Sequence, residues 1–175
     1  VRLVTLTGGP GVGKTRLAQD LIAHAQASGA TVLRGGCYEF EATTPYLPFV
    51  ESFREWVHWQ GVGEMRTLLG ATAPEIAKLA PEIDARLGGL APNATLSAGE
   101  ERLRLFDNVA RFLQALAASR GLLVFIDDIH WADQGTLSLL HYLLRHLKEN
   151  RVLFLAAYRE IELDRTHPLA SAPVE

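Results

Sequence analysis

The chain has 175 residues, which is enough for one domain with a hydrophobic core of its own. Hydrophobic residues make up 48% and charged residues 21% of it, as is ordinary for a soluble globular protein. The net charge of −3 gives no electrostatic basis for direct contact with DNA or RNA. No apolar run approaches the length needed to cross a bilayer, so we expect no membrane partner.

The single cysteine, Cys37, excludes an internal disulfide, and a reducing compartment, the cytoplasm, fits best. We expect Cys37 to be a small buried residue at a strand end rather than a reactive thiol. The chain shows no secretory signal and begins abruptly within a predicted strand. We therefore expect it to be a fragment of a longer protein.

The first motif follows a predicted strand over residues 1–7, where β-forming residues alternate with polar ones. Gly8-Gly9-Pro10-Gly11-Val12-Gly13-Lys14-Thr15 matches the phosphate-binding loop pattern of Gly, four residues, Gly, Lys and Ser or Thr. Apolar residues then recur at helical spacing, which predicts a helix over about 14–28. Strand, loop and helix come in the order that a phosphate-binding loop requires.

The residue types in this loop suit a polyphosphate. Glycines let the backbone approach the ligand and turn successive N–H groups inward. Lys14 supplies a compact positive charge for the outer phosphates, and the hydroxyl of Thr15 can ligate Mg²⁺. The residues that we expect to contact nucleotide are Gly8, Gly9, Gly11, Val12, Gly13, Lys14, Thr15 and Arg16.

A second strand is predicted over residues 30–35, so that residues 1–35 form a right-handed βαβ unit. Five prolines punctuate the next stretch, and two or three short helices with loops are predicted there. We interpret residues 36–96 as a helical insert within a single core of residues 1–175. Its aromatic residues are expected to pack its core rather than to face a partner: Phe40, Tyr46, Phe49, Phe53, Trp56 and Trp59.

Beyond the insert, Ser97 and Glu100 form a capping box that predicts the start of a long helix. Five apolar residues over 122–126 then predict a strand buried on both faces, as in parallel sheets. Asp127 and Asp128 follow at its carboxyl end, which is where open α/β sheets bind ligands. Asp127 can hold Mg²⁺, and Asp128 can orient or deprotonate an attacking water. Without the phosphate-binding loop elsewhere in the chain, the pair would fit a simple turn equally well.

The next residues have more than one interpretation. Asp133 is best explained as the N-cap of a leucine-rich helix, and Trp131 as a packing residue. His130 could sense the state of the nucleotide or serve as a structural histidine. A fourth strand is predicted over 151–158, and Arg159 directly after it could reach a γ-phosphate or lie in solvent. Residues 160–175 are predicted to form a loosely structured tail.

These motifs together resemble a known class. Gly8–Thr15 with Arg16-Leu17-Ala18, the run Phe125-Ile126-Asp127-Asp128-Ile129-His130-Trp131-Ala132-Asp133, and Tyr158-Arg159 are similar to the STAND-type P-loop ATPase module. The closest similarity is to the AAA-like ATPase domain of large ATP-binding LuxR-family transcriptional regulators. Related modules occur in bacterial multidomain cyclases and kinases.

The resemblance implies an α/β fold, a P-loop NTPase three-layer αβα sandwich with a mostly parallel sheet. It implies that the fourth strand lies between the first and third, giving the order second, third, fourth, first. It also implies that Lys14 contacts the β- and γ-phosphates, that Thr15 and Asp127 bind Mg²⁺, that Asp128 supports hydrolysis, and that Arg159 is the sensor arginine.

The chain departs from the family pattern at both ends. A segment that helps to hold adenine usually precedes the first strand, and a fifth strand, a helical lid and a winged-helix element usually follow Arg159. We therefore expect a truncated module whose partners are nucleotide and the remaining domains of a parent chain, a DNA-binding domain among them. We also expect that the protein could oligomerise in an ATP-dependent way.

Three functions are compatible with this pattern. The first is an ATP-binding, slowly hydrolysing switch that uses ATP/ADP and Mg²⁺ in a signalling or transcriptional regulator. The second is a phosphoryl-transfer enzyme such as a small-molecule kinase, but the insert shows no cluster of Arg or Lys for a phosphorylated acceptor. The third is a DNA-acting motor ATPase, against which the slightly acidic balance argues.

Overall fold

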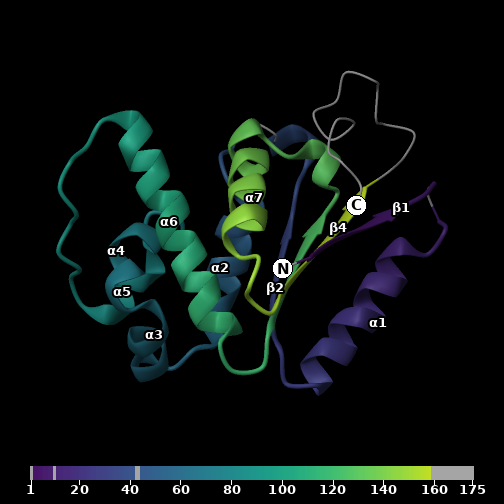
Figure 1. Ribbon diagram of the computed structural model, residues 1–175, viewed down its shortest axis with the longest axis horizontal. Coiled ribbons are helices and arrows are strands. Elements are labelled where there is room, and N and C mark those ends of the chain that lie inside the picture. Colours follow the sequence, from purple (N-terminus) through teal and green to yellow (C-terminus); the bar gives the residue numbers. More distant parts are fainter. Residues whose placement is uncertain (1, 10, 42–43, 159–175) are drawn as a thin grey trace.

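The computed structural model describes residues 2–9, 11–41 and 44–158, and Arg159 and the predicted tail lie outside that part. The described residues form a four-stranded sheet and seven α-helices (Figure 1). The strands are β1 (Arg2–Thr7), β2 (Thr31–Gly36), β3 (Leu122–Asp127) and β4 (Val152–Tyr158). The α-helices are α1 (Lys14–Ala27), α2 (Leu47–Trp59), α3 (Val62–Leu69), α4 (Ala73–Ile76), α5 (Glu82–Leu87), α6 (Ala98–Ala117) and α7 (Gln134–His146). Three short 3₁₀ turns complete them: η1 (Glu39–Glu41), η2 (Gly70–Thr72) and η3 (Ile129–Trp131).

All strand pairs in the described sheet are parallel, in the order β1-β4-β3-β2. This confirms both the predicted α/β fold and the predicted position of β4 between β1 and β3. The register pairs Thr7 with Tyr158 and Ile126 with Ala156. The carboxyl ends of β1, β4 and β3 therefore meet at one edge of the sheet.

The sheet lies between two layers of helices, which makes the sandwich three layers thick (Figure 1). Side chains alternate along each strand, so Leu122, Val124 and Ile126 point to one face while Leu123 and Phe125 point to the other. On the first face the core continues into α2, α6 and α7. On the second face it is closed by α1. Strand β3 is thus buried on both faces, as its unbroken apolar run predicts.

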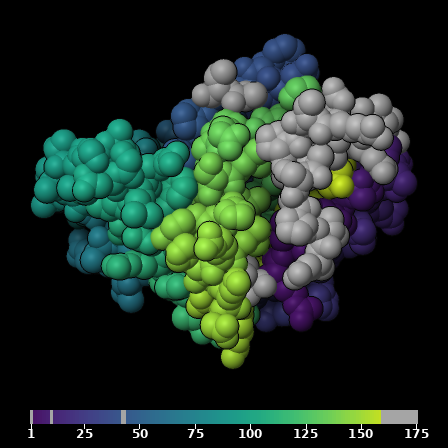
Figure 2. Space-filling model, turned by 45° about the horizontal axis from the view of Figure 1, so that its top comes forward, coloured from purple at the N-terminus to yellow at the C-terminus, as the bar shows by residue number. Residues whose placement is uncertain are grey.

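Residues 44–96 form four short α-helices in the described part, more than the two or three that the prolines predict. The first of them, α2, packs directly on β2. Gly35 makes this close approach feasible, because a Cβ atom there would overlap the main chain of Pro48. In the space-filling view the teal surface of the later insert residues and α6 lies on one side of α7, and the purple surface of the first residues lies on the other (Figure 2).

The aromatic residues of the insert divide into two groups, so the prediction of one packed cluster is partly wrong. Phe49, Phe53 and Trp56 are buried, and Phe53 and Trp56 make edge-to-face contacts with Phe112 of α6. In contrast, Phe40 is 94% exposed and Trp59 is 76% exposed. Phe40 is the middle residue of the short turn η1, and Trp59 is the last residue of α2.

A buried ionic network joins the insert to α6. The carboxylate of Glu75 is fully buried, 2.7 Å from Nε of Arg104 and 3.0 Å from Nζ of Lys78. Asn93 donates a further hydrogen bond of 2.7 Å to the same carboxylate. These partners offset the cost of burying a charge and tie α6 and the loop before it to α4. No helix in the described part is both long and apolar enough for a membrane span.

The contrast between Phe53 and Phe40 gives a matched test of the insert core. Phe53→Ala should lower the free energy of unfolding by about 3–5 kcal/mol, because it opens a cavity among fully buried rings. Phe40→Ala removes the same atoms from an exposed position and should change it by less than about 0.5 kcal/mol. Denaturant unfolding followed by circular dichroism measures both values, and equal losses would show that Phe40 is packed in solution.

Candidate functional site

The phosphate-binding loop joins β1 to α1 at the carboxyl edge of the sheet. Gly11 and Gly13 have φ angles of 76° and 97°, in the left-handed region where a side chain is strained. Gly13 is also the N-cap of α1, so its conformation turns the chain directly into the helix. The first N–H groups of α1 lack partners within the helix, and with the helix dipole they favour an anion at this point.

Lys14 is the first residue of α1, and its side chain folds back over the loop. Its Nζ donates hydrogen bonds to the carbonyl oxygens of Gly8 at 2.7 Å and Gly9 at 2.9 Å. These two bonds hold the positive charge beside the loop. Because an ammonium group has three N–H donors, one donor is left for a phosphate. Thr15 and Arg16 are exposed, and Val12 is 66% exposed. A polyphosphate can therefore approach the loop from solvent.

The acidic pair lies at the same sheet edge, with β4 between it and the loop. Asp127 ends β3, and its Oδ1 accepts a hydrogen bond of 3.0 Å from the backbone N–H of Asp128. Asp128 has a φ of 47° and a ψ of 45°, a left-handed conformation that costs on the order of 1–3 kcal/mol for a residue with a side chain. Such strain is typical of functional sites, although Asp tolerates it better than most residues.

These oxygen ligands are the kind that Mg²⁺ prefers, but they do not form an all-protein cage. The described residues include no group of three or more His, Cys, Asp or Glu side chains arranged to hold a metal ion. A magnesium ion bound through one or two protein oxygens takes its other ligands from water and substrate phosphates. The hydroxyl of Thr15 and the carboxylate of Asp127 fit that type of site.

Three residues after the pair have the surroundings that their sequence context suggests. His130 is 6% exposed, with its Nδ1 4.0 Å from Oδ1 of Asp128. Trp131 is half-buried and packs against the main core, which agrees with a packing role. Asp133 accepts a hydrogen bond of 3.0 Å from the backbone N–H of Thr136, which confirms it as the N-cap of α7.

Cys37 is buried directly after β2, as predicted, and its backbone N–H donates to the carbonyl oxygen of Asp127 at 3.0 Å. Burial raises the pKa of its thiol to about 12, with smaller contributions from the carboxylates of Asp133, Glu51, Asp128 and Asp127. The thiol is therefore protonated near neutral pH and unsuited to act as a nucleophile.

Two polar contacts at this edge are not predicted by the sequence. Glu51 of α2 accepts a hydrogen bond of 2.8 Å from the backbone N–H of Gly36, the residue that pairs with Asp127 across the sheet. Asp133 accepts a second bond, of 3.2 Å, from the backbone N–H of Tyr46. Both contacts join residues that are far apart in the chain, so no local sequence pattern indicates either of them.

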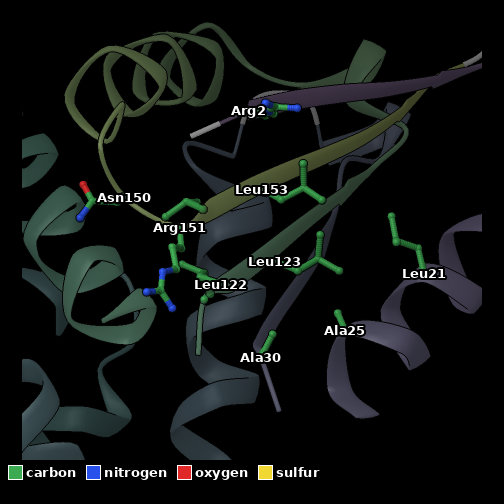
Figure 3. Close-up of a pocket in the computed structure, with 11 residues that line it drawn as sticks. Arg2, Leu21, Ala25, Ala30, Leu122, Leu123, Asn150, Arg151 and Leu153 are labelled. Carbon is green, nitrogen blue, oxygen red and sulfur yellow. The ribbon is translucent and has the colours of Figure 1, made fainter. Parts of the chain in front are cut away.

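The structure also has a pocket of about 430 Å³ at the opposite edge of the sheet, between α1 and the amino ends of the strands. Its walls are mainly apolar: Leu21 and Ala25 of α1 lie across from Leu123 and Leu153 of the sheet (Figure 3). None of the predicted site residues lines it. The candidate site is therefore the carboxyl edge, where the loop and the acidic pair meet, while Arg159 lies outside the described residues.

Comparison with known proteins agrees with this geometry. The search of curated proteins finds no match. The sequence model of the AAA ATPase domain matches residues 1–155, which include the phosphate-binding loop, the acidic pair and most of β4. Because this match covers most of the chain and the parallel sheet is that of a P-loop NTPase, the protein belongs to the AAA ATPase domain family.

Proposed function

We propose that this chain is an ATP-binding module that hydrolyses ATP slowly and acts as a switch within a multidomain signalling or transcriptional regulator. The observation that carries the proposal is the meeting of the phosphate-binding loop and the Asp127–Asp128 pair at one sheet edge, one strand apart. A P-loop ATPase needs both elements on the same phosphate chain.

The loop residues bind and orient the substrate. Backbone N–H groups of residues 11–15 and the N-terminus of α1 hold the phosphates, while Lys14 moves its ammonium group from the loop carbonyls to the β- and γ-phosphates. Val12 within the loop and Arg16 directly after it are both exposed, and we propose that they contact the nucleotide as well. Arg159 would add a positive charge at the end of β4, beside the γ-phosphate.

The two residues of the acidic pair have different roles in this proposal. Thr15 and Asp127 would hold Mg²⁺, which when bound neutralises phosphate charge and favours attack at the γ-phosphorus. Asp128 orients the attacking water and accepts its proton. Its left-handed backbone restricts the directions that the carboxylate can take, which supports this role.

A switch needs a difference between the two nucleotide states. Only ATP offers a γ-phosphate, which Arg159 would contact directly and Asp128 through the attacking water, so only ATP can link these two groups. ATP can shift the equilibrium between two arrangements of the protein only by as much as its affinities for those arrangements differ. Slow hydrolysis would keep each state long enough for other domains of a parent chain to respond, a DNA-binding domain among them.

Lys14→Ala should abolish nucleotide binding, because it removes the positive charge nearest the outer phosphates. We expect ATP affinity to fall at least about 100-fold, measured by isothermal titration calorimetry with Mg²⁺ present. Lys148→Ala is the matched control, since Lys148 precedes β4 at the opposite edge of the sheet. Near-wild-type affinity in Lys14→Ala would remove the central claim.

Asp128→Asn should separate binding from hydrolysis. Asn tolerates the left-handed conformation of this position but cannot take up a proton from water. We expect kcat to fall at least about 100-fold while the Kd for ATP changes less than about threefold. Phosphate release and calorimetry measure the two quantities, and unchanged turnover would assign water activation to another residue.

The purified chain should carry nucleotide if it is a resting-state switch. After denaturation, chromatography of the supernatant should show close to stoichiometric ADP from the wild type and none from Lys14→Ala. This experiment also identifies the base. Rapid steady-state turnover with no retained nucleotide would contradict the switch and favour a phosphoryl-transfer enzyme, and turnover stimulated by DNA would favour a motor.

A further inference from the structure

We propose that Asp133 is a positioning residue that ties the Asp127–Asp128 segment to the start of α2 in the helical insert, so that the insert controls ATP hydrolysis. This inference rests on the proposed function, because the segment that it positions carries the water-orienting Asp128. It assigns Asp133 a role beyond that of a helix cap.

The carboxylate of Asp133 accepts hydrogen bonds from the starts of two helices, α7 and α2. Its Oδ1 accepts from the backbone N–H of Thr136 at 3.0 Å and caps α7. Its Oδ2 accepts from the backbone N–H of Tyr46 at 3.2 Å and also from the hydroxyl of Thr136. Tyr46 in turn is the N-cap of α2, and its carbonyl oxygen accepts from Phe49 and Val50. The carboxylate therefore joins the starts of α7 and α2.

Tyr46 is held in an unfavourable conformation at this junction. Its φ of 60° lies in the left-handed region, and the only other described non-glycine residue with positive φ is Asp128. A bulky side chain adopts this conformation only where its surroundings impose it. The ring of Tyr46 packs edge-on against Phe106 of α6, with centroids 6.0 Å apart. It also lies against Gly135, where a Cβ atom would stand 3.1 Å from the ring and 2.8 Å from Oδ1 of Asp133.

The chain between Asp128 and Asp133 has little freedom to absorb a displacement. The carbonyl oxygen of Asp128 accepts from Trp131 at 2.9 Å, and that of Ile129 accepts from Ala132 at 3.0 Å. Ile129 is 2% exposed and anchors this turn in the main core. A shift at Asp133 therefore reaches Asp128 through one short hydrogen-bonded turn, which is a physical connection rather than mere proximity.

The variant that isolates this contact is Asp133→Asn. Asn is as good an N-cap as Asp, so Oδ1 can still accept from Thr136, but the amide NH₂ cannot accept from Tyr46. Thr136→Val is the matched control, because it removes the hydroxyl bond to the same carboxylate and leaves the cap and the Tyr46 contact. Gly135→Ala is a second disturbing variant, which inserts a methyl group between Asp133 and the Tyr46 ring without removing a polar group.

Hydrogen exchange of the whole chain, read by NMR without nucleotide, tests the contact itself. The Tyr46 amide should exchange at least about tenfold faster in Asp133→Asn and within about threefold of wild type in Thr136→Val. Circular dichroism confirms that each variant is folded. Unchanged exchange of the Tyr46 amide in Asp133→Asn would overturn the proposal.

Kinetics then test control of hydrolysis. With Mg²⁺ and ATP, Asp133→Asn and Gly135→Ala should lower kcat about tenfold while the Kd for ATP stays within about threefold, and Thr136→Val should leave both within about twofold. A loss of kcat in all three variants, or in none, would overturn the positioning role. If the wild type neither binds nor hydrolyses ATP, the proposed function and the positioning role both fail. If the wild type hydrolyses ATP and its kcat is unaltered in Asp133→Asn and Gly135→Ala, only the positioning role fails.

Discussion

The parallel register of β1, β4 and β3 is the constraint on which the candidate site depends. It places the ends of the three strands at one edge, so the loop after Thr7 and the carboxylate of Asp127 are separated by the width of one strand. Neighbouring strands lie about 4.8 Å apart, so the backbones of the loop and of Asp127 are about 10 Å apart, the scale of a phosphate chain with its metal ion. The helices on both faces keep this spacing fixed, because β3 and β4 bury alternate residues in two separate cores.

Much of this arrangement follows from short-range patterns. The glycine-rich loop, the capping box at Ser97 and Glu100, and the N-cap at Asp133 each involve residues within a few positions of one another, so the sequence predicts them correctly. The position of β4 between β1 and β3 is different, since only the resemblance to a family implies it and sequence spacing does not. The parallel sheet confirms that expectation, and the family match over residues 1–155 confirms the P-loop ATPase fold.

The features that sequence reasoning missed are all set by tertiary packing. Nothing local indicates that Glu75 is fully buried, because its partners Asn93 and Arg104 lie 18 or more positions further along the chain. The left-handed conformation of Tyr46 is equally unpredictable, since tyrosine has no preference for it and the surrounding helices impose it. Phe40 shows the reverse error: an aromatic residue predicts burial on average, but this one stands in a turn that the core does not reach.

The insert contacts the candidate site at two hydrogen-bonded points, and these contacts can couple the position of the insert to nucleotide binding. Its helices share a buried aromatic and ionic core with α6, so they should respond as a unit rather than one by one. That unit contacts the edge that carries the candidate site through Glu51 at Gly36 and through Tyr46 at Asp133. If ATP changes the position of Asp128, the same contacts must change the position of the insert, because coupling between two sites is reciprocal. A partner that binds the insert would then alter hydrolysis without touching the nucleotide.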